Sequence, residues 1–151
     1  MLPPIEPSAL RMSSLPTWVH VYYTPSTLWV GFRCEGTPGD KLEAQFTQRD
    51  DKVWRDDSVD VILNHLSDPE KSAHISVNCA AVVYDALGGD ASWNPDLTVQ
   101  TARDSKGWSA VIGIPFKVLG AAMPKDEHTW AVNFCRSTSA RPRAWRRLCT
   151  G

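Results

Sequence analysis

The stretch "KVWRDDSVDVILN" (residues 52–64) decides the fold. In its second half the side chains alternate with a period of two, which is the period of a β-strand. Val59, Val61 and Leu63 share one face of this expected strand, and Asp60 lies in mid-strand on the other. One face is therefore expected to be buried. The carboxylate on the opposite face indicates either a ligand site or an ordinary solvated sheet.

The same alternation recurs along most of the chain, and clusters of Gly, Pro, Asp and Ser separate the repeats. The only helix-like segment is the short "PFKVLGAAM" (residues 115–123). This pattern predicts an all-β protein, an antiparallel, jelly-roll-like β-sandwich with at most one short helix. The other expected strands are 18–23, 28–34, 74–80, 82–86, 97–102, 108–116 and 130–136.

Length and charge restrict the function. A chain of 151 residues predicts one domain, here a sandwich over 16–151 preceded by an extended, proline-containing segment or linker over 1–15. The net charge of -1 argues against a nucleic-acid partner, and the basic cluster at 141–147 is expected to be a solvated tail or loop. No apolar run is long enough for membrane insertion, and the N-terminus has no signal-peptide pattern.

Polar side chains occupy the middle of several expected strands. Asp60, Asn78, Gln100 and Asn133 all fall on the face that the alternation turns away from the core. Asp and Asn are poor strand formers. Their presence therefore favours a polar binding face, and the alternative is a sheet that simply faces water.

Seven tryptophans are many for this length, which favours a stacking surface. Trp54 lies in a charged, Asp-rich segment just before its strand. It is therefore expected to be either exposed toward a ligand or partly buried where the strand begins. Trp18, Trp29, Trp108 and Trp130 stand within alternating runs, and they are expected to pack in the core.

Five stretches in order, over residues 18–147, resemble the family 9 carbohydrate-binding modules and their DOMON-like relatives. They are "STLWVGFRC", "DDKVWRDDSVDVILN", "HISVNCAAVVYD", "GWSAVIGIPFKVLG" and "WAVNFCRS". The resemblance implies a β-sandwich that binds an oligo- or polysaccharide without catalysis, with calcium sites common in its loops. It also implies a secreted or periplasmic module, linked to catalytic domains in a longer protein, and a chain that stops before the family's usual last strand.

By position, the resemblance gives Trp54 the role of a stacking aromatic. Asp60, one methylene shorter than the family's glutamate, becomes the hydrogen-bond acceptor. Arg136 stands where a second aromatic is expected, and two loop tryptophans are substitutes for it. With the polar strand positions, the expected sugar contacts are Trp54, Asp60, Asn78, Gln100, Asn133, Arg136, Trp93 and Trp145.

Catalysis is not expected. Glycoside hydrolysis needs two carboxyl groups on either side of one sugar, and adjacent Asp56 and Asp57 point to opposite faces of an extended chain. No nucleophile, zinc or phosphate-loop motif is present in the sequence.

The sequence offers candidate ligands for two cofactors, calcium and haem. Asp50, Asp51, Asp56 and Asp57 form either a calcium site or an acidic loop balanced by nearby basic residues. Some DOMON-like relatives bind haem, but a haem needs an apolar slot and this face is polar. A haem-binding electron-transfer domain therefore remains the alternative function, as does an interaction domain without sugar binding. The candidate haem ligands are His20, His65, His74, His128, Met12 and Met123.

The four cysteines are Cys34, Cys79, Cys135 and Cys149. The first three lie in expected strands, where small buried thiols are common. Free buried thiols and at least one disulfide are both compatible with the sequence, which does not choose among the pairings.

Overall fold

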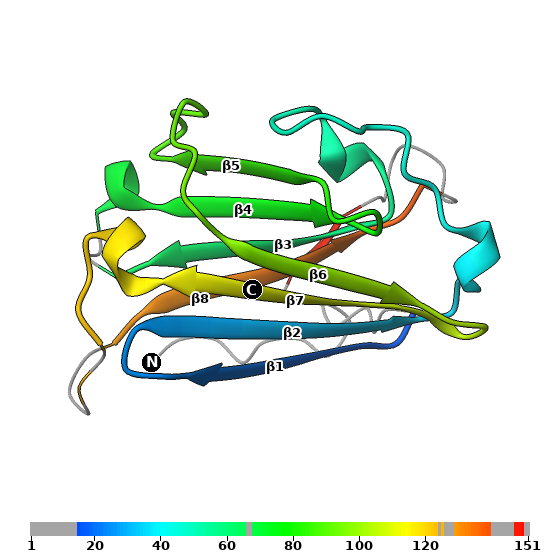
Figure 1. Ribbon diagram of the computed structural model, residues 1–151, viewed down its shortest axis with the longest axis horizontal. Helices are drawn as coiled ribbons and strands as arrows, with labels where there is room; N and C mark the ends of the chain where they lie inside the picture. The colour runs from blue at the N-terminus through cyan, green and yellow to red at the C-terminus, as the bar shows by residue number, and fades with distance from the viewer. Residues whose placement is uncertain (1–14, 66–67, 124, 126–128, 140–146, 150–151) are drawn as a thin grey trace, which may run out of the picture.

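The structure is a computed structural model that describes residues 15–65, 68–123, 125, 129–139 and 147–149 (Figure 1). These residues form two antiparallel β-sheets and, within the described part, no α-helix. No described segment is a helix long and apolar enough to cross a membrane. Short 3-10 turns lie at Gly39–Lys41 (η2), Val53–Arg55 (η3), Pro69–Lys71 (η4) and Phe116–Leu119 (η5).

The first sheet, here called sheet A, has four strands in the order β1-β2-β7-β6. Strand β1 is its outer edge, at the bottom of the view in Figure 1. The strands are β1 (Thr17–Tyr23), β2 (Thr27–Glu35), β7 (Gly107–Pro115) and β6 (Thr98–Arg103).

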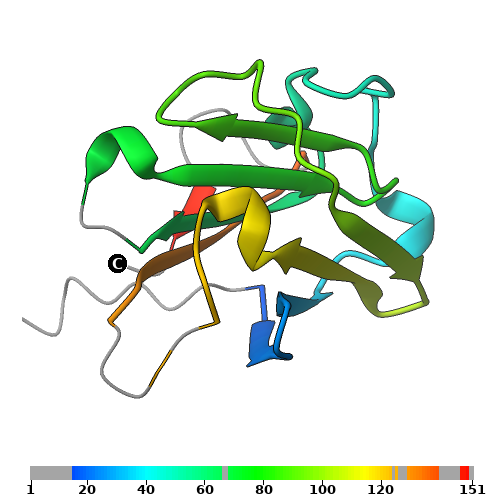
Figure 2. The ribbon, with the colours of Figure 1, turned by 60° about the vertical axis from the view of Figure 1, so that its left-hand side comes forward.

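The second sheet, sheet B, has five strands in the order β5-β4-β3-β8-β9. Its central strand is β3, which lies between β4 and β8. Figure 2 shows the two sheets as separate layers. The strands are β5 (Val83–Leu87), β4 (Ala73–Asn78), β3 (Ser58–Asn64), β8 (Ala131–Ser137) and β9 (Arg147–Cys149).

The core lies between the sheets and follows from strand alternation. Sheet A contributes Val30, Phe32 and Ile112, and sheet B contributes Val61 and Ile75, all 3 % exposed or less. Because every second side chain of each strand enters the same layer, the residues between them face outward. The inner faces join the sheets, and the outer faces are where a ligand can bind.

The eight predicted strands are confirmed to within one or two residues at their ends. The expected short helix at 115–123 is a 3-10 turn, η5. Strand β9 was not predicted because it has only three residues and begins at Arg147, the end of the basic C-terminal cluster, so no apolar alternation marks it.

The tryptophans only partly follow the expectation of core packing. Trp108 is fully buried, and Trp130 is half-buried against the core. Trp18 is 47 % exposed on the edge strand β1, so its expected burial is wrong. Trp29 lies half-buried on the outer face of β2, because it alternates with the buried Leu28 and Val30.

The cysteines divide into two kinds. Cys135 is disulfide-bonded, and its backbone pairs with that of Cys149 across β8 and β9. Cys34 and Cys79 are free and almost completely buried. Burial raises the pKa of each of these two thiols to about 11, because a thiolate loses its hydration there.

We expect Cys34 and Cys79 to resist thiol reagents in the native protein. With a pKa of about 11, only about 0.1 % of each thiol is ionised at pH 8, and the reagent must also reach it. Titration with Ellman's reagent should find no fast-reacting thiol in the native state, two in guanidinium chloride, and four after reduction. Rapid reaction of either thiol in the folded protein would contradict this burial.

Candidate functional site

Three neighbouring strands place polar and aromatic side chains together on the outer face of sheet B. Asp60 of β3 pairs in register with Ser76 of β4, which in turn pairs with Tyr84 of β5. His74 lies on the same face, two residues before Ser76. Its Nε2 lies 2.8 Å from Oδ1 of Asp60, a hydrogen bond in which the imidazole donates and the carboxylate accepts.

Aromatic rings continue this row toward the edge of the sheet. The His74 and Tyr84 rings meet edge to face, with centroids 5.6 Å apart. Trp54, in the 3-10 turn before β3, meets the Tyr84 ring in the same way at 4.9 Å. We call Trp54, Tyr84, His74 and Asp60 the sheet B cluster. It presents half-buried aromatic rings beside an imidazole.

Asp60 lies at the bottom of this cluster. Its side chain is 0 % exposed, whereas that of His74 is 28 % exposed. The predicted direct contact between Asp60 and a sugar therefore does not fit, because His74 lies between the carboxylate and solvent. Asp60 instead fixes the orientation of the imidazole.

The two aspartates before β3 hold the preceding loop rather than a ligand. Both Asp56 oxygens accept backbone hydrogen bonds, from the N–H groups of Gln45 at 3.0 Å and Phe46 at 3.1 Å. Asp57 accepts one from the N–H of Glu43 at 2.9 Å. Buried backbone donors need such partners, so the "DD" pair completes the hydrogen bonding of an extended loop that lacks a strand partner.

Asn78, a predicted sugar contact, belongs to the same buried hydrogen-bond network. Its Nδ2 donates to the carbonyl of Phe46 at 3.0 Å and to Asp56 at 2.9 Å. Its Oδ1 accepts from the N–H groups of Ala80 and Val82. With the side chain fully buried and all four of these bonds made inside the protein, its amide has no capacity left for a ligand.

The four carboxylates considered for calcium do not come together. No three His, Cys, Asp or Glu side chains among the described residues form a cluster that could hold a metal ion. Asp56 and Asp57 accept hydrogen bonds from the backbone of the loop over residues 43–46. Asp51 accepts from the N–H of Gln48, and Asp50 lies near the N–H of Asp85 at 3.5 Å.

Arg136 points into the molecule and not toward the sheet B cluster. It pairs in register with Val59, whose side chain is in the core, and it is 2 % exposed. Its Nη1 donates to the carbonyls of Pro16 at 3.2 Å and Glu35 at 2.9 Å, and to Oγ1 of Thr17 at 3.1 Å. This guanidinium therefore joins β8 of sheet B to β1 and β2 of sheet A, and it is not a sugar contact.

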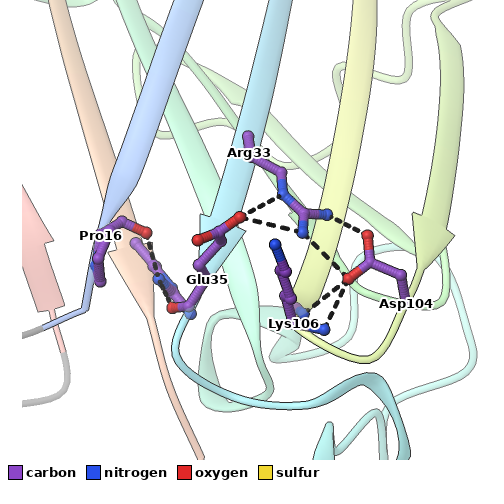
Figure 3. A network of polar contacts seen from close by, with 7 residues as sticks. Pro16, Arg33, Glu35, Asp104 and Lys106 are labelled. Atoms are coloured by element: carbon purple, nitrogen blue, oxygen red, sulfur yellow. Dashed lines mark hydrogen bonds and ion pairs between the residues drawn. The ribbon is translucent and has the colours of Figure 1, made fainter.

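The same corner of the molecule carries an exposed ion-pair network. Arg33 contacts Glu35 and, through Nη1 at 2.6 Å, Asp104 (Figure 3). The Arg33 guanidinium, and then the backbone N–H of Lys106, hold the pKa of Asp104 well below its usual value. These contacts fix the turn between β6 and β7 and contribute no ligand-binding geometry.

The remaining predicted contacts are dispersed. Asn133 is half-buried and shares the outer face of sheet B with Asp60. Gln100 is exposed on β6 of sheet A, so it cannot join a site on sheet B. Trp93 packs half-buried against the core, and Trp145 lies outside the described residues.

The haem candidates are also dispersed. His74 is held by Asp60, and the His65 ring packs against Trp130 with centroids 5.3 Å apart. His20 is exposed on β1, and Met123 is 42 % exposed after η5. Met12 and His128 lie outside the described residues.

Tyr84 is the cluster member that sequence reasoning missed. It stands in the expected strand "VVYDA", but tyrosine is common in strands, so it does not stand out there as Asp60 and Asn78 do in theirs. The available signal was alternation within the β4–β5 hairpin, which puts Tyr84 on the outer face opposite the buried Asp85.

Comparison with solved structures shows the same fold in proteins of low sequence identity. A family 9 carbohydrate-binding module from Caldicellulosiruptor kristjanssonii, solved with cellotriose, has a TM-score of 0.67 and 14 % identity. The match covers 93 % of this chain and 66 % of the module. A family 9 module from the same organism, solved with glucose, gives a TM-score of 0.66, with 14 % identity over 93 % and 67 % of the two chains.

A protein of Bacteroides uniformis, to which carbohydrate binding has been assigned provisionally, gives a TM-score of 0.70 and 13 % identity over 89 % of this chain and 68 % of its own. No family model matches this sequence, and no curated protein matches it. The predicted all-β sandwich of the family 9 type is therefore confirmed as a fold.

Proposed function

We propose that this protein binds an oligosaccharide, without catalysis, at the sheet B cluster. The observation that carries the proposal is the contact of Trp54 and Tyr84 beside His74 on an outer sheet face. A pyranose ring has apolar C–H faces and a rim of hydroxyl groups. Aromatic rings can cover the faces, and the imidazole can hydrogen-bond the rim.

The fold supports this choice of ligand. The structurally similar module was solved with cellotriose and with glucose, so β-linked gluco-oligosaccharides are the first ligands to test. In this arrangement Trp54 stacks on a sugar ring, His74 contacts a hydroxyl, and Asp60 positions His74. The imidazole of His74 thus takes the hydroxyl-binding role that the sequence predicts for the Asp60 carboxylate.

The proposed location is an oxidising compartment, the periplasm or the cell exterior. The disulfide at Cys135 supports it, because disulfides persist in such compartments and are rare in a reducing cytosol. Linkage to a catalytic domain in a longer protein is part of the same proposal.

Replacement of Trp54 by alanine is the test of this site. The variant should lose affinity for cello-oligosaccharides by about tenfold or more, which corresponds to about 1.4 kcal/mol, because the stacking ring is gone. Isothermal titration with glucose, cellobiose and cellotriose measures the affinity, and thermal unfolding checks the fold. The loss of unfolding free energy should stay small, because Trp54 is only half-buried.

The matched control is Tyr23→Ala, which removes a 54 % exposed aromatic on sheet A, outside the cluster. It should bind like the wild type. If the wild-type protein binds no sugar of a broad glycan panel while folded, the proposed function is wrong. If Trp54→Ala binds normally, the site lies elsewhere.

A further inference from the structure

A second aromatic surface lies on the outer face of sheet A. Tyr22 of β1 and Trp29 of β2 are paired in register, so their side chains leave the sheet side by side. Their rings are nearly parallel, at 10°, with centroids 6.1 Å apart. Tyr22 is 56 % exposed, although a large aromatic side chain gains stability from burial. The pair therefore has an exposed aromatic surface that the fold itself does not use.

Glycines keep this surface flat. Gly113 of β7 is the register partner of Trp29 on its other side. A Cβ added to Gly113 would come within 2.7 Å of Cζ3 of Trp29, and within 3.0 Å of two further atoms of the ring. The indole therefore lies against the backbone of β7, and a side chain at 113 would lift it. Two residues further along β2, Gly31 stands in register between His20 of β1 and Val111 of β7. It therefore also adds no side chain to this face of the sheet.

Groups that hydrogen-bond hydroxyls border the aromatic pair. His20 lies in the next row of β1, and Thr98 and Gln100 lie on β6, paired with Gly113 and Val111. All three are exposed. Gln100, expected from the sequence to contact a sugar but excluded from the sheet B cluster, thus stands on this face.

A hollow lies beyond the Trp29–Gly113 pair, at the end of sheet A where β2 begins and β7 ends. It is lined by residues 25–27, 115–117 and 121–123. Its Thr27–Pro115 pair lies two residues along the ladder from the Trp29–Gly113 pair. A chain-like ligand that crosses the rings therefore has a recess at the end of its path.

We propose that Tyr22, Trp29 and Gly113 form a second glycan-binding surface, which takes the pyranose rings of an extended polysaccharide chain. Nearly parallel aromatic rings beside hydroxyl-binding groups fit the alternating apolar and polar surfaces of such a chain. A partner protein usually inserts side chains into pockets at the centre of an interface, whereas here glycines make the surface flush. Because it lies on the opposite sheet, this surface is independent of the sheet B cluster.

The test compares two neighbouring tyrosines. Tyr22 and Tyr23 have nearly equal exposure, 56 % and 54 %, and they alternate to opposite faces of β1. Full-length wild-type protein should be retained on insoluble cellulose, measured as depletion from solution. Tyr22→Ala should reduce its partition coefficient about fivefold to tenfold, whereas Tyr23→Ala should leave it unchanged. Gly113→Ala, which disturbs the Trp29 ring without removing an aromatic group, should also weaken retention.

Soluble ligands separate this proposal from the first one. Tyr22→Ala should keep its affinity for cellotriose, and Trp54→Ala should lose that affinity while keeping most of its retention on the insoluble polymer. The proposal is overturned if wild-type protein is not retained on cellulose, xylan, chitin or mannan, or if the two tyrosine variants behave alike. It is also overturned if Tyr22→Ala dissociates a dimer in sedimentation, because the face would then join two copies of the chain.

Discussion

Replacement of Asp56 by alanine is expected to lower the free energy of unfolding by about 3–5 kcal/mol. The carboxylate is 2 % exposed and accepts three hydrogen bonds, from the N–H groups of Gln45 and Phe46 and from Nδ2 of Asn78. Its removal leaves these donors without their acceptor and opens a cavity beside them. Urea or guanidinium unfolding followed by tryptophan fluorescence measures the loss.

The control is Asp51→Ala in the same acidic run. Asp51 is half-exposed and accepts one bond, from the N–H of Gln48 at 3.2 Å, so its loss should cost less than about 1 kcal/mol. Asp56→Asn, which keeps the shape and one acceptor oxygen, should fall between the two. Equal unfolding midpoints for Asp56→Ala and Asp51→Ala would show that the loop does not depend on the buried carboxylate.

Replacement of Arg136 by alanine should cost about 2–4 kcal/mol. The guanidinium is buried and supplies one donor group to the carbonyls of Pro16 and Glu35 and to the hydroxyl of Thr17. Its loss separates β1 from sheet B at this corner. Denaturant unfolding measures the cost, and hydrogen exchange in β1 should accelerate.

Arg33→Ala is the matched control for Arg136→Ala, because Arg33 contacts the side chain of the same Glu35 from the solvent side. Exposed ion pairs contribute little, so the control should lose far less stability than Arg136→Ala, and less still at high salt. If Arg136 were a sugar contact, its replacement would lower affinity and leave stability unchanged. That outcome would refute the structural role.

Alternation predicted the strands well because each buries one face against a common core. The burial of Val59, Val61 and Leu63 follows from their spacing alone. Alternation also grouped Arg136 with Val132 and Phe134, on the inner set, and only the family resemblance made it a ligand contact. The register confirms the inner placement.

Other site residues could not be placed from the sequence, for two physical reasons. Alternation indicates that a side chain points away from the core, but not which sheet its strand joins. The sequence therefore could not show that Gln100 and Asp60 lie on different sheets. It also does not show what covers an outer face. Asn78 and Asp56 are buried by a loop from residues 43–46, ten or more residues away from Asp56 in sequence.

The buried network around Asp56 and Asn78 constrains related sequences that share this fold. Its residues serve the fold whether or not any sugar binds, so substitutions there should be poorly tolerated in every descendant of this architecture. By contrast, the half-buried rings of Trp54 and Tyr84 would vary more freely if the proposed sugar site were lost. A homologue that keeps "DDS" and the strand asparagine is therefore expected to keep the sandwich, and its residues at positions 54 and 84 indicate whether the proposed glycan site is kept.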